Sequence, residues 1–190
     1  PLVKVTIVPR GIGTLGYAQY LPKEEYITRT EQLLDRMCMT LGGRAAEDVI
    51  FSKISTGAQN DLDRVTKMAY SMIAVFGMNP KVGNVSFYSM QQEQFHKPFS
   101  DNTATLIDEE VRLLINEQYE RAKKLLLEKR DDLEKLAKEL LDKEVILKSD
   151  VEKLIGPRPW QDRRDHLSEE EAEAAAAAHN QHNGAAEDMA

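Results

Sequence analysis

The sequence has few of the residues and patterns that mark several common classes of protein. It contains a single cysteine, Cys38, in 190 residues, which excludes an internal disulfide framework. Because Cys38 falls within a helical apolar pattern, we predict an inert, buried thiol. No stretch approaches the roughly 18 consecutive apolar residues that cross a bilayer, and no Gly-x-x-x-x-Gly-Lys-Ser/Thr phosphate loop occurs. We therefore expect this chain by itself to be soluble and to lack an ATP site.

Positive charge is also scarce. The chain has 32 acidic and 25 basic residues, a net charge of -7, which argues against a nucleic-acid partner. The excess is concentrated in residues 161–190, which hold eight acids and two arginines. That segment also contains an alanine run without an apolar face, so it is predicted to be a frayed or disordered tail. Residues 1–160 then form one folded domain.

Two runs near the start of the chain have the composition of β-strands. Leu2–Val8 alternates β-branched with polar residues and is followed by Pro9, while Leu15–Leu21 is closed by Pro22. A Gly-rich turn separates the two runs, which predicts a β-hairpin. Gly16 within the second run would allow close approach of the backbone.

The stretch Ile54–Gly77 organises the rest of the sequence. Six apolar residues recur at helical spacing, namely Leu62, Val65, Ala69, Met72, Ile73 and Phe76, and predict an amphipathic helix that Gly77 ends. Asn60 is placed to cap it, which leaves Asp61 and Asp63 in the first turn, where the helix dipole favours negative charge. A carboxylate is thus held on a rigid element beside a Ser-Thr-Gly loop, although first-turn acids commonly serve only as capping partners.

The remaining patterns are mostly helical. The Thr28–Glu31 spacing predicts a capped helix starting near Arg29. The Gly42-Gly43 pair within this helical region is interpreted as a site of close packing against another helix. Residues 77–103 are predicted to be a surface loop, with only Val82–Tyr88 strand-like or buried.

From Thr103 onward, two apolar stripes separated near Arg130-Asp131 predict long helices in a hairpin or bundle. The Ser149–Glu152 spacing predicts a short capped helix ending at Gly156. The fold class is therefore α+β and mostly α-helical, with a small hairpin or sheet near the N-terminus and a C-terminal helical bundle.

Three stretches in this order, Lys4–Gly11, Leu41–Glu47 and Ser55–Leu62, resemble the peptidase domain of the FtsH family of membrane-bound, ATP-dependent zinc metalloproteases. The resemblance covers about residues 1–160. Met37–Thr40 is most similar to the mitochondrial, matrix-facing m-AAA branch.

The resemblance implies that Asp61 is the third protein ligand of a catalytic zinc, supported by a turn containing Thr56, Gly57 and Asn60. Asp63 is interpreted as further support for the turn and not as a ligand. The family's other two ligands are histidines of a His-Glu-x-x-His helix, whose glutamate is the general base. No such motif occurs here, so we expect a fragment that lacks that helix and is inactive alone. The four histidines are His96, His166, His179 and His182.

The family also implies a substrate site and partners. An edge strand beside the zinc would bind the substrate backbone by strand addition, for which Leu15, Gly16, Tyr17 and Ala18 are candidates; a plain structural hairpin is an equal alternative. The parent protein would degrade unfolded or damaged membrane-associated proteins as a homo- or hetero-hexamer. It would carry a membrane anchor and an ATPase module that uses ATP and magnesium. Its location would be the matrix face of the mitochondrial inner membrane or, alternatively, a bacterial or chloroplast membrane.

Two other interpretations remain open. The chain could be a noncatalytic interaction or oligomerisation module whose long C-terminal helices are the functional surface. It could instead be an enzyme that completes a metal site with His179 and His182, which have a spacing of three residues on the tail. His96 has no second ligand nearby at metal spacing and is interpreted as a solvated or packing histidine.

Overall fold

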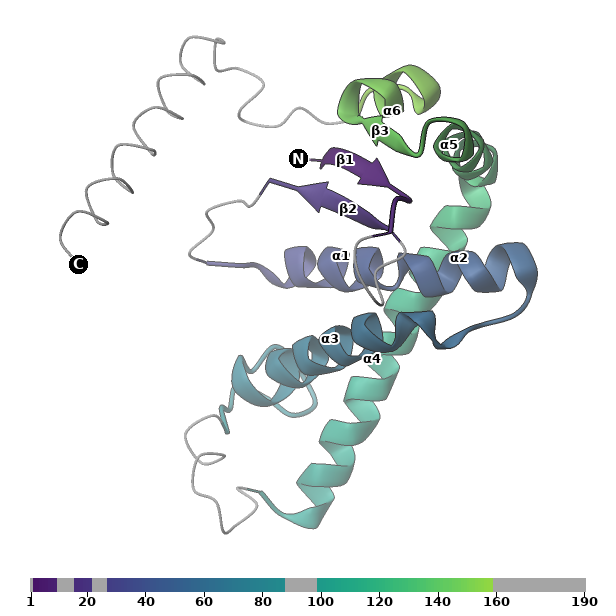
Figure 1. The fold of residues 1–190 in the computed structure, drawn as a ribbon. Coiled ribbons are helices and arrows are strands. Elements are labelled where there is room, and N and C mark those ends of the chain that lie inside the picture. Colours follow the sequence, from purple (N-terminus) through teal and green to yellow (C-terminus); the bar gives the residue numbers. More distant parts are fainter. Residues whose placement is uncertain (1, 10–15, 22–26, 88–98, 159–190) are drawn as a thin grey trace, which may run out of the picture.

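Helices dominate the residues that the computed structural model describes, which are 2–9, 16–21, 27–87 and 99–158. A small antiparallel sheet accompanies them (Figure 1). The predicted class, α+β and mostly helical, is confirmed. The boundary near residue 160, the tail and the segment around His96 lie outside the described residues.

The sheet has three strands in the order β2-β1-β3. The central strand β1 (Leu2–Thr6) pairs antiparallel with β2 (Tyr17–Tyr20) and with β3 (Val145–Leu147). The hairpin is therefore confirmed, although β1 ends before Ile7. A Cβ atom on Gly16 would lie 2.7 Å from the carbonyl oxygen of Thr6, which confirms the predicted close approach. Strand β3 was not predicted, because its three residues are too few to show the alternation of a strand.

Helices α1 (Thr30–Thr40) and α2 (Gly42–Phe51) follow each other end to end (Figure 1). The helix start near Arg29 is confirmed, but its predicted cap is wrong. The backbone N–H of Arg29 donates to the Gln32 side chain at 2.7 Å, one residue later than the Thr28–Glu31 spacing. A Cβ atom on Gly42 or Gly43 would meet no described atom within 4 Å. Close packing on this glycine pair therefore does not come from the described part of the chain.

Helix α3 (Gln59–Tyr70) continues directly into a π-helical turn, η2 (Ser71–Val75). The backbone N–H of Phe76 donates to the carbonyl of Ser71, five residues back, at 2.9 Å. A π turn carries one residue more than an α turn and so changes which face the following residue occupies. Phe76 is 56% exposed, so its predicted place on the buried face is wrong.

The hydrophobic core joins α1, α3 and η2 to the long helix α4 (Asp101–Glu128). Its best-buried large side chains are Met37, Leu41, Val65, Met72, Ile73 and Ile107. The loop after η2 forms no strand over its described residues, but Val82 and Phe87 pack against this core. Ring contact between Phe87 and Phe99 at 5.0 Å fixes the described ends of the connection to α4.

The C-terminal elements form a second group with the sheet. Helix α5 (Arg130–Lys143) begins where the sequence predicts a break, and α6 (Lys148–Ile155) ends at Gly156 as predicted. The predicted cap of α6 is wrong, because Asp150 accepts from the backbone of Leu147 at 3.0 Å. α5 and α6 pack with β3, and α6 also packs against β1, whereas α4 packs against α1, α2 and α3 (Figure 1). Among the described helices, none is both long and apolar enough to span a membrane.

Candidate functional site

Asp61 occupies the first turn of α3, as predicted. Val65 and Ala69, one and two turns further along, are fully buried in the core, so the helix that carries Asp61 is firmly anchored. The predicted cap is wrong: Asn60 is the second residue of α3, and the cap position is held by Ala58 without a side-chain hydrogen bond. The cap moves because a 3₁₀ turn, η1 (Thr56–Ala58), precedes the helix and is itself capped by Ser55.

The Asp61 carboxylate is half-buried and makes no hydrogen bond or ion pair with any other described residue. Asp63 differs, because its carboxylate lies 2.7 Å from Lys67 Nζ on the next turn. Asp63 is therefore an exposed acid on the surface of the helix. A capping acid would accept backbone hydrogen bonds, and Asp61 accepts none from the described residues, but its place in the first turn agrees with a helix-dipole partner. Its oxygens have no competing partner in the described chain.

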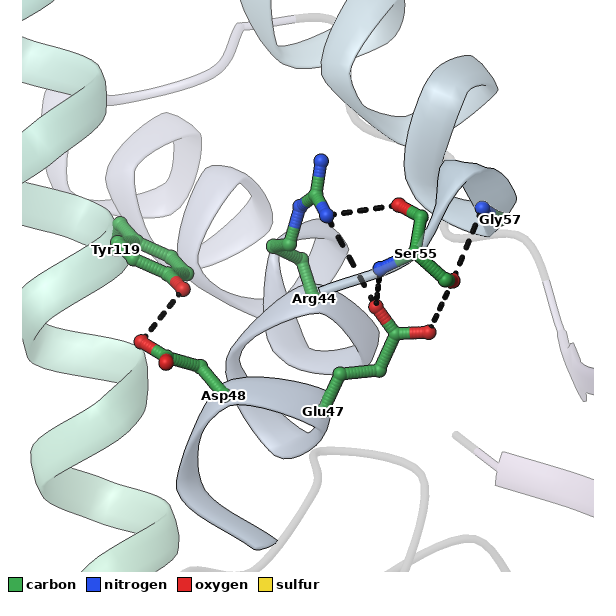
Figure 2. A network of polar contacts seen from close by, with 6 residues as sticks. All are labelled: Arg44, Glu47, Asp48, Ser55, Gly57 and Tyr119. Carbon is green, nitrogen blue, oxygen red and sulfur yellow. Dashed lines mark hydrogen bonds and ion pairs between the residues drawn. The ribbon is translucent and has the colours of Figure 1, made fainter. Parts of the chain in front are cut away.

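The turn before Asp61 is held by two side chains of α2 (Figure 2). Glu47 accepts from the backbone N–H of Ser55 at 3.0 Å and also from the Ser55 hydroxyl. Arg44 donates to the Ser55 carbonyl at 2.8 Å and lies 3.9 Å from Glu47. Ser55 Oγ in turn accepts from the backbone N–H of Gly57 at 3.2 Å. The two hydrogen bonds from Ser55 hold the pKa of Glu47 below its usual range.

Helix α2 is fixed to α4 on another side (Figure 2). The Tyr119 hydroxyl donates to Asp48 at 2.9 Å, and Lys123 Nζ lies 3.5 Å from the same carboxylate. Lys123 also lies 4.9 Å from the centre of the Tyr119 ring, within cation–π range. Burial, followed by the bond to Asp48, raises the pKa of Tyr119. The turn that precedes Asp61 is thus connected through α2 to α4, the longest of the described helices.

The structure brings some of the predicted site residues together and not others. Thr56 and Gly57 form η1, next to Asp61. Tyr17 and Ala18 lie on β2, at the edge of the sheet, directly after the exposed Gly16. Leu15 lies outside the described residues. β2 packs on β1, whereas η1 packs on α2 and α3, so the two predicted parts of the site belong to different groups of packed elements.

Sequence reasoning gave no role to Arg44, Glu47 or Ser55. Arg44 and Glu47 lie in the Gly-Gly-Arg-Ala-Ala-Glu stretch that carries part of the family resemblance, which was the one available signal. Their contacts with Ser55 span 8 to 11 residues and depend on how the chain turns after α2. Residue spacing alone does not specify such a turn.

A zinc site needs about four donors, and the described residues do not supply them. No group of three or more His, Cys, Asp or Glu side chains within these residues is placed to hold a metal ion. The four histidines, including His179 and His182, all lie outside the described ranges. The Asp61 carboxylate fits one coordination position, and no reaction step follows from these residues alone.

A family assignment has to accommodate a mostly helical layer, a small antiparallel sheet, and a carboxylate that no other described residue pairs with, placed after a turn held by Arg44 and Glu47. The model of peptidase family M41 matches residues 1–154, and the chain belongs to this family. The resemblance to FtsH-type peptidase domains is thereby confirmed.

Individual relatives agree with this assignment. An "ATP-dependent zinc metalloprotease FtsH" of Rhodothermus marinus is 57% identical over 166 residues, which cover 85% of this chain and 24% of that protein. The mouse "Mitochondrial inner membrane m-AAA protease component AFG3L2" is 56% identical over 165 residues, 86% of this chain and 20% of that protein. An Arabidopsis thaliana relative, "ATP-dependent zinc metalloprotease FTSH 10, mitochondrial", is 49% identical over 160 residues, 84% and 20% respectively. The chain thus spans between a fifth and a quarter of the length of these relatives.

Proposed function

We propose that this chain is part of an ATP-dependent zinc metalloendopeptidase in which Asp61 supplies one protein ligand to zinc. The observation that carries the proposal is the half-buried Asp61 carboxylate on an anchored helix, without a hydrogen-bond or ion-pair partner among the described residues. The names of the relatives support the protease activity and the metal.

Only part of the chemistry belongs to these residues. In zinc peptidases the metal activates a water molecule and polarises the scissile carbonyl. The role of Asp61 is to hold the metal, and two histidines of a His-Glu-x-x-His helix elsewhere in the longer protein would complete the ligand set. Thr56 and Gly57 shape the turn that presents Asp61. The chain alone is then inactive as a peptidase.

The substrate is an unfolded or damaged membrane-associated polypeptide. An extended segment of it would add to the sheet at β2, next to Gly16, Tyr17 and Ala18. Leu15, which precedes Gly16 in the sequence, belongs to the same proposed site. The position of β2 at the edge of the described sheet supports this role, because peptides in many complexes add as a further strand beside an edge strand.

The active form is a homo- or hetero-hexamer driven by an ATPase module that uses ATP and magnesium. The mouse and Arabidopsis relatives are named as mitochondrial, and the mouse protein as an inner-membrane component. They support a parent protein anchored in the mitochondrial inner membrane and facing the matrix, with a bacterial or chloroplast membrane as the alternative.

Two matched substitutions test the role of Asp61. In the full-length protein, Asp61→Asn should weaken retention of zinc and reduce ATP-dependent casein cleavage by about a hundredfold or more, because a neutral amide is a poor zinc ligand. Asp63→Asn makes the same change two residues away, on an exposed side chain paired with Lys67, and should leave both quantities unchanged. Thermal unfolding and hexamer size are measured for each variant.

The proposal for Asp61 is wrong if Asp61→Asn retains zinc and cleaves casein at the wild-type rate. If the wild-type protein itself neither binds zinc nor cleaves casein, a noncatalytic interaction module is the better description. One feature of the structure favours that second candidate: Leu125 and Leu127 near the end of α4, and Leu141 near the end of α5, are 53%, 57% and 74% exposed. Leucines this exposed are candidates for contact with another protein.

A further inference from the structure

The segment that leads from α2 to the Asp61 turn is not held by burial. Every residue from 51 to 57 is exposed, and the side chains of Phe51 and Ile54 are 69% and 62% exposed. Exposed connections of this kind adopt many conformations unless specific contacts restrict them. Asp61 follows this segment closely, so the position of the segment bears directly on the carboxylate.

Polar contacts at Ser55 supply the missing restraint (Figure 2). Glu47 binds the backbone N–H and the hydroxyl of Ser55, and Arg44 binds its carbonyl oxygen. All three polar groups of a single residue are therefore engaged by two side chains one helical turn apart. Bonds to charged groups are stronger than neutral ones, and contact on several sides fixes the orientation of the residue as well as its position.

Further hydrogen bonds connect Ser55 to the helical turn that carries the Asp61 carboxylate. Ser55 Oγ accepts from Gly57 N–H at 3.2 Å, and the Thr56 carbonyl accepts from Gln59 N–H. Gln59 is the first residue of α3 and Asp61 is the third. The chain is therefore connected by hydrogen bonds from α2 through η1 to the helical turn that presents Asp61.

We propose that Arg44 and Glu47 are positioning residues for Asp61. Their hydrogen bonds to Ser55, called the grip below, fix the turn that orients the Asp61 carboxylate. The inference rests on the proposed function, because Asp61 must be a ligand for its position to affect catalysis. A few partly exposed polar contacts add little to global stability, whereas a shift of about 1 Å near a reacting centre can cost about a hundredfold in rate. The grip should therefore influence activity far more than it influences folding.

The first test removes the grip in the full-length protein. Glu47→Ala should lower kcat for labelled casein by about tenfold or more, with little change in KM, because the substrate contacts are elsewhere. The melting temperature should stay close to that of the wild type. Hydrogen exchange at the amides of Ser55 and Gly57 should become faster, while the amides of α3 keep their protection. The exchange measurement requires neither zinc nor activity.

Two conservative variants separate reach from charge. Glu47→Gln keeps the length of the side chain and one acceptor oxygen for the Ser55 amide, and Glu47→Asp keeps the charge but is one methylene shorter. A grip predicts that the Gln variant retains more activity than the Asp variant. The reverse order would show that charge alone matters and would overturn the proposal.

Glu139→Ala is the matched control. Glu139 pairs with Lys143 on α5, and its side chain is 25% exposed, compared with 30% for Glu47. It should leave kcat and the exchange at Ser55 unchanged. If Glu47→Ala does not fold, Ser55→Ala provides a second test. This variant loses the hydroxyl contacts but keeps the hydrogen bond from the Ser55 backbone N–H to Glu47. It should lower kcat by less than the roughly tenfold expected for Glu47→Ala.

The outcomes distinguish this inference from the function on which it rests. A Glu47→Ala protein with wild-type kcat, or with unchanged exchange at Ser55 and Gly57, overturns the positioning role even if Asp61→Asn is inactive. A wild-type protein without casein cleavage overturns the proposed function and the positioning role together. If Glu47→Ala lowers both kcat and the melting temperature, the positioning role is also overturned, because the loss of activity would then follow from destabilisation of the whole fold.

Discussion

Glu47 connects the ionisation state of the protein to the turn before Asp61. Its carboxylate accepts two hydrogen bonds from Ser55 and faces Arg44 at 3.9 Å. These contacts favour the charged form, so the pKa of Glu47 in the folded protein lies below its value in the unfolded chain. Protonation removes the charge and one acceptor site at the same time. The turn should therefore be sensitive to acid.

At the residue scale, we predict that the Ser55 turn loosens only below the ordinary pKa of a glutamate. A group whose pKa is lowered by folding contributes its full stabilisation above the unfolded value, about 4.3, and loses it as the pH falls through the lower folded value. An NMR titration of the Ser55 amide should therefore be flat from pH 7 to about 5 and should inflect at lower pH. In Glu47→Gln the inflection should be absent, and its persistence would assign the titration to another group.

The sequence placed Asp61 correctly because the apolar residues that anchor α3, such as Val65 and Ala69, reveal the helix by their spacing. It could not reveal that the Asp61 carboxylate has no partner among the described residues or that Glu47 binds Ser55. Those facts depend on the path of the exposed residues after α2, where no apolar pattern exists. The cap at Asn60 was predicted wrongly for a related reason: Ser55 begins a 3₁₀ turn first, and α3 then starts at Gln59, two residues before the start that a cap at Asn60 implies.

At the scale of elements, the π turn η2 determines how α3 ends. Helical spacing predicted the buried positions up to Ile73 but not the exposed Phe76, because a simple helical period assumes no extra residue. Gly77 then adopts a φ of +63°, and a Cβ atom there would lie 3.3 Å from the backbone of Asn84 and Val85. Gly77 therefore ends the helix, as predicted, and also allows the backbone of Asn84 and Val85 to approach closely.

Two glycine substitutions should therefore change stability in opposite directions. Gly77→Ala should lower the free energy of unfolding by about 1–2 kcal/mol, because alanine is strained at positive φ and the backbone around it has little room to move. Gly43→Ala should raise it by up to about 1 kcal/mol, because Gly43 is helical and no described atom lies near its Cβ position. Urea unfolding of this chain measures both effects. A destabilised Gly43→Ala variant would indicate that something does pack against this face.

At the scale of the whole molecule, the packed elements form two groups. One contains α1, α2, α3, η2 and α4 around the core, and the other contains the sheet, α5 and α6 around the buried side chain of Ile146. The two meet mainly at the junction between α4 and α5 (Figure 1). The sequence predicted the helices of both groups, but not that β3 would join the C-terminal helices to the N-terminal hairpin.

Each group should lose stability separately. Ile146→Ala should weaken hydrogen-exchange protection in β1, α5 and α6, and Ile73→Ala should weaken it in α1, α3 and α4. Truncation of a buried isoleucine costs about 2–5 kcal/mol, which is enough to open one group while the other keeps its contacts. Exchange measured by mass spectrometry resolves the two regions. A uniform loss of protection from either variant would show that the molecule unfolds as one unit.

The central position of β1 has a consequence for biosynthesis. Lys4, Val5 and Thr6 pair on one side with residues 17–19 and on the other with residues 145–147. During translation β1 and β2 therefore leave the ribosome long before β3. One side of β1 stays without β3 while more than 120 further residues are synthesised. Such distant pairings form late, and an unpaired strand edge is prone to aggregate. We expect the nascent chain to need protection over this interval, and ribosome-bound chains truncated before residue 145 should aggregate more readily on release than those that extend beyond residue 158.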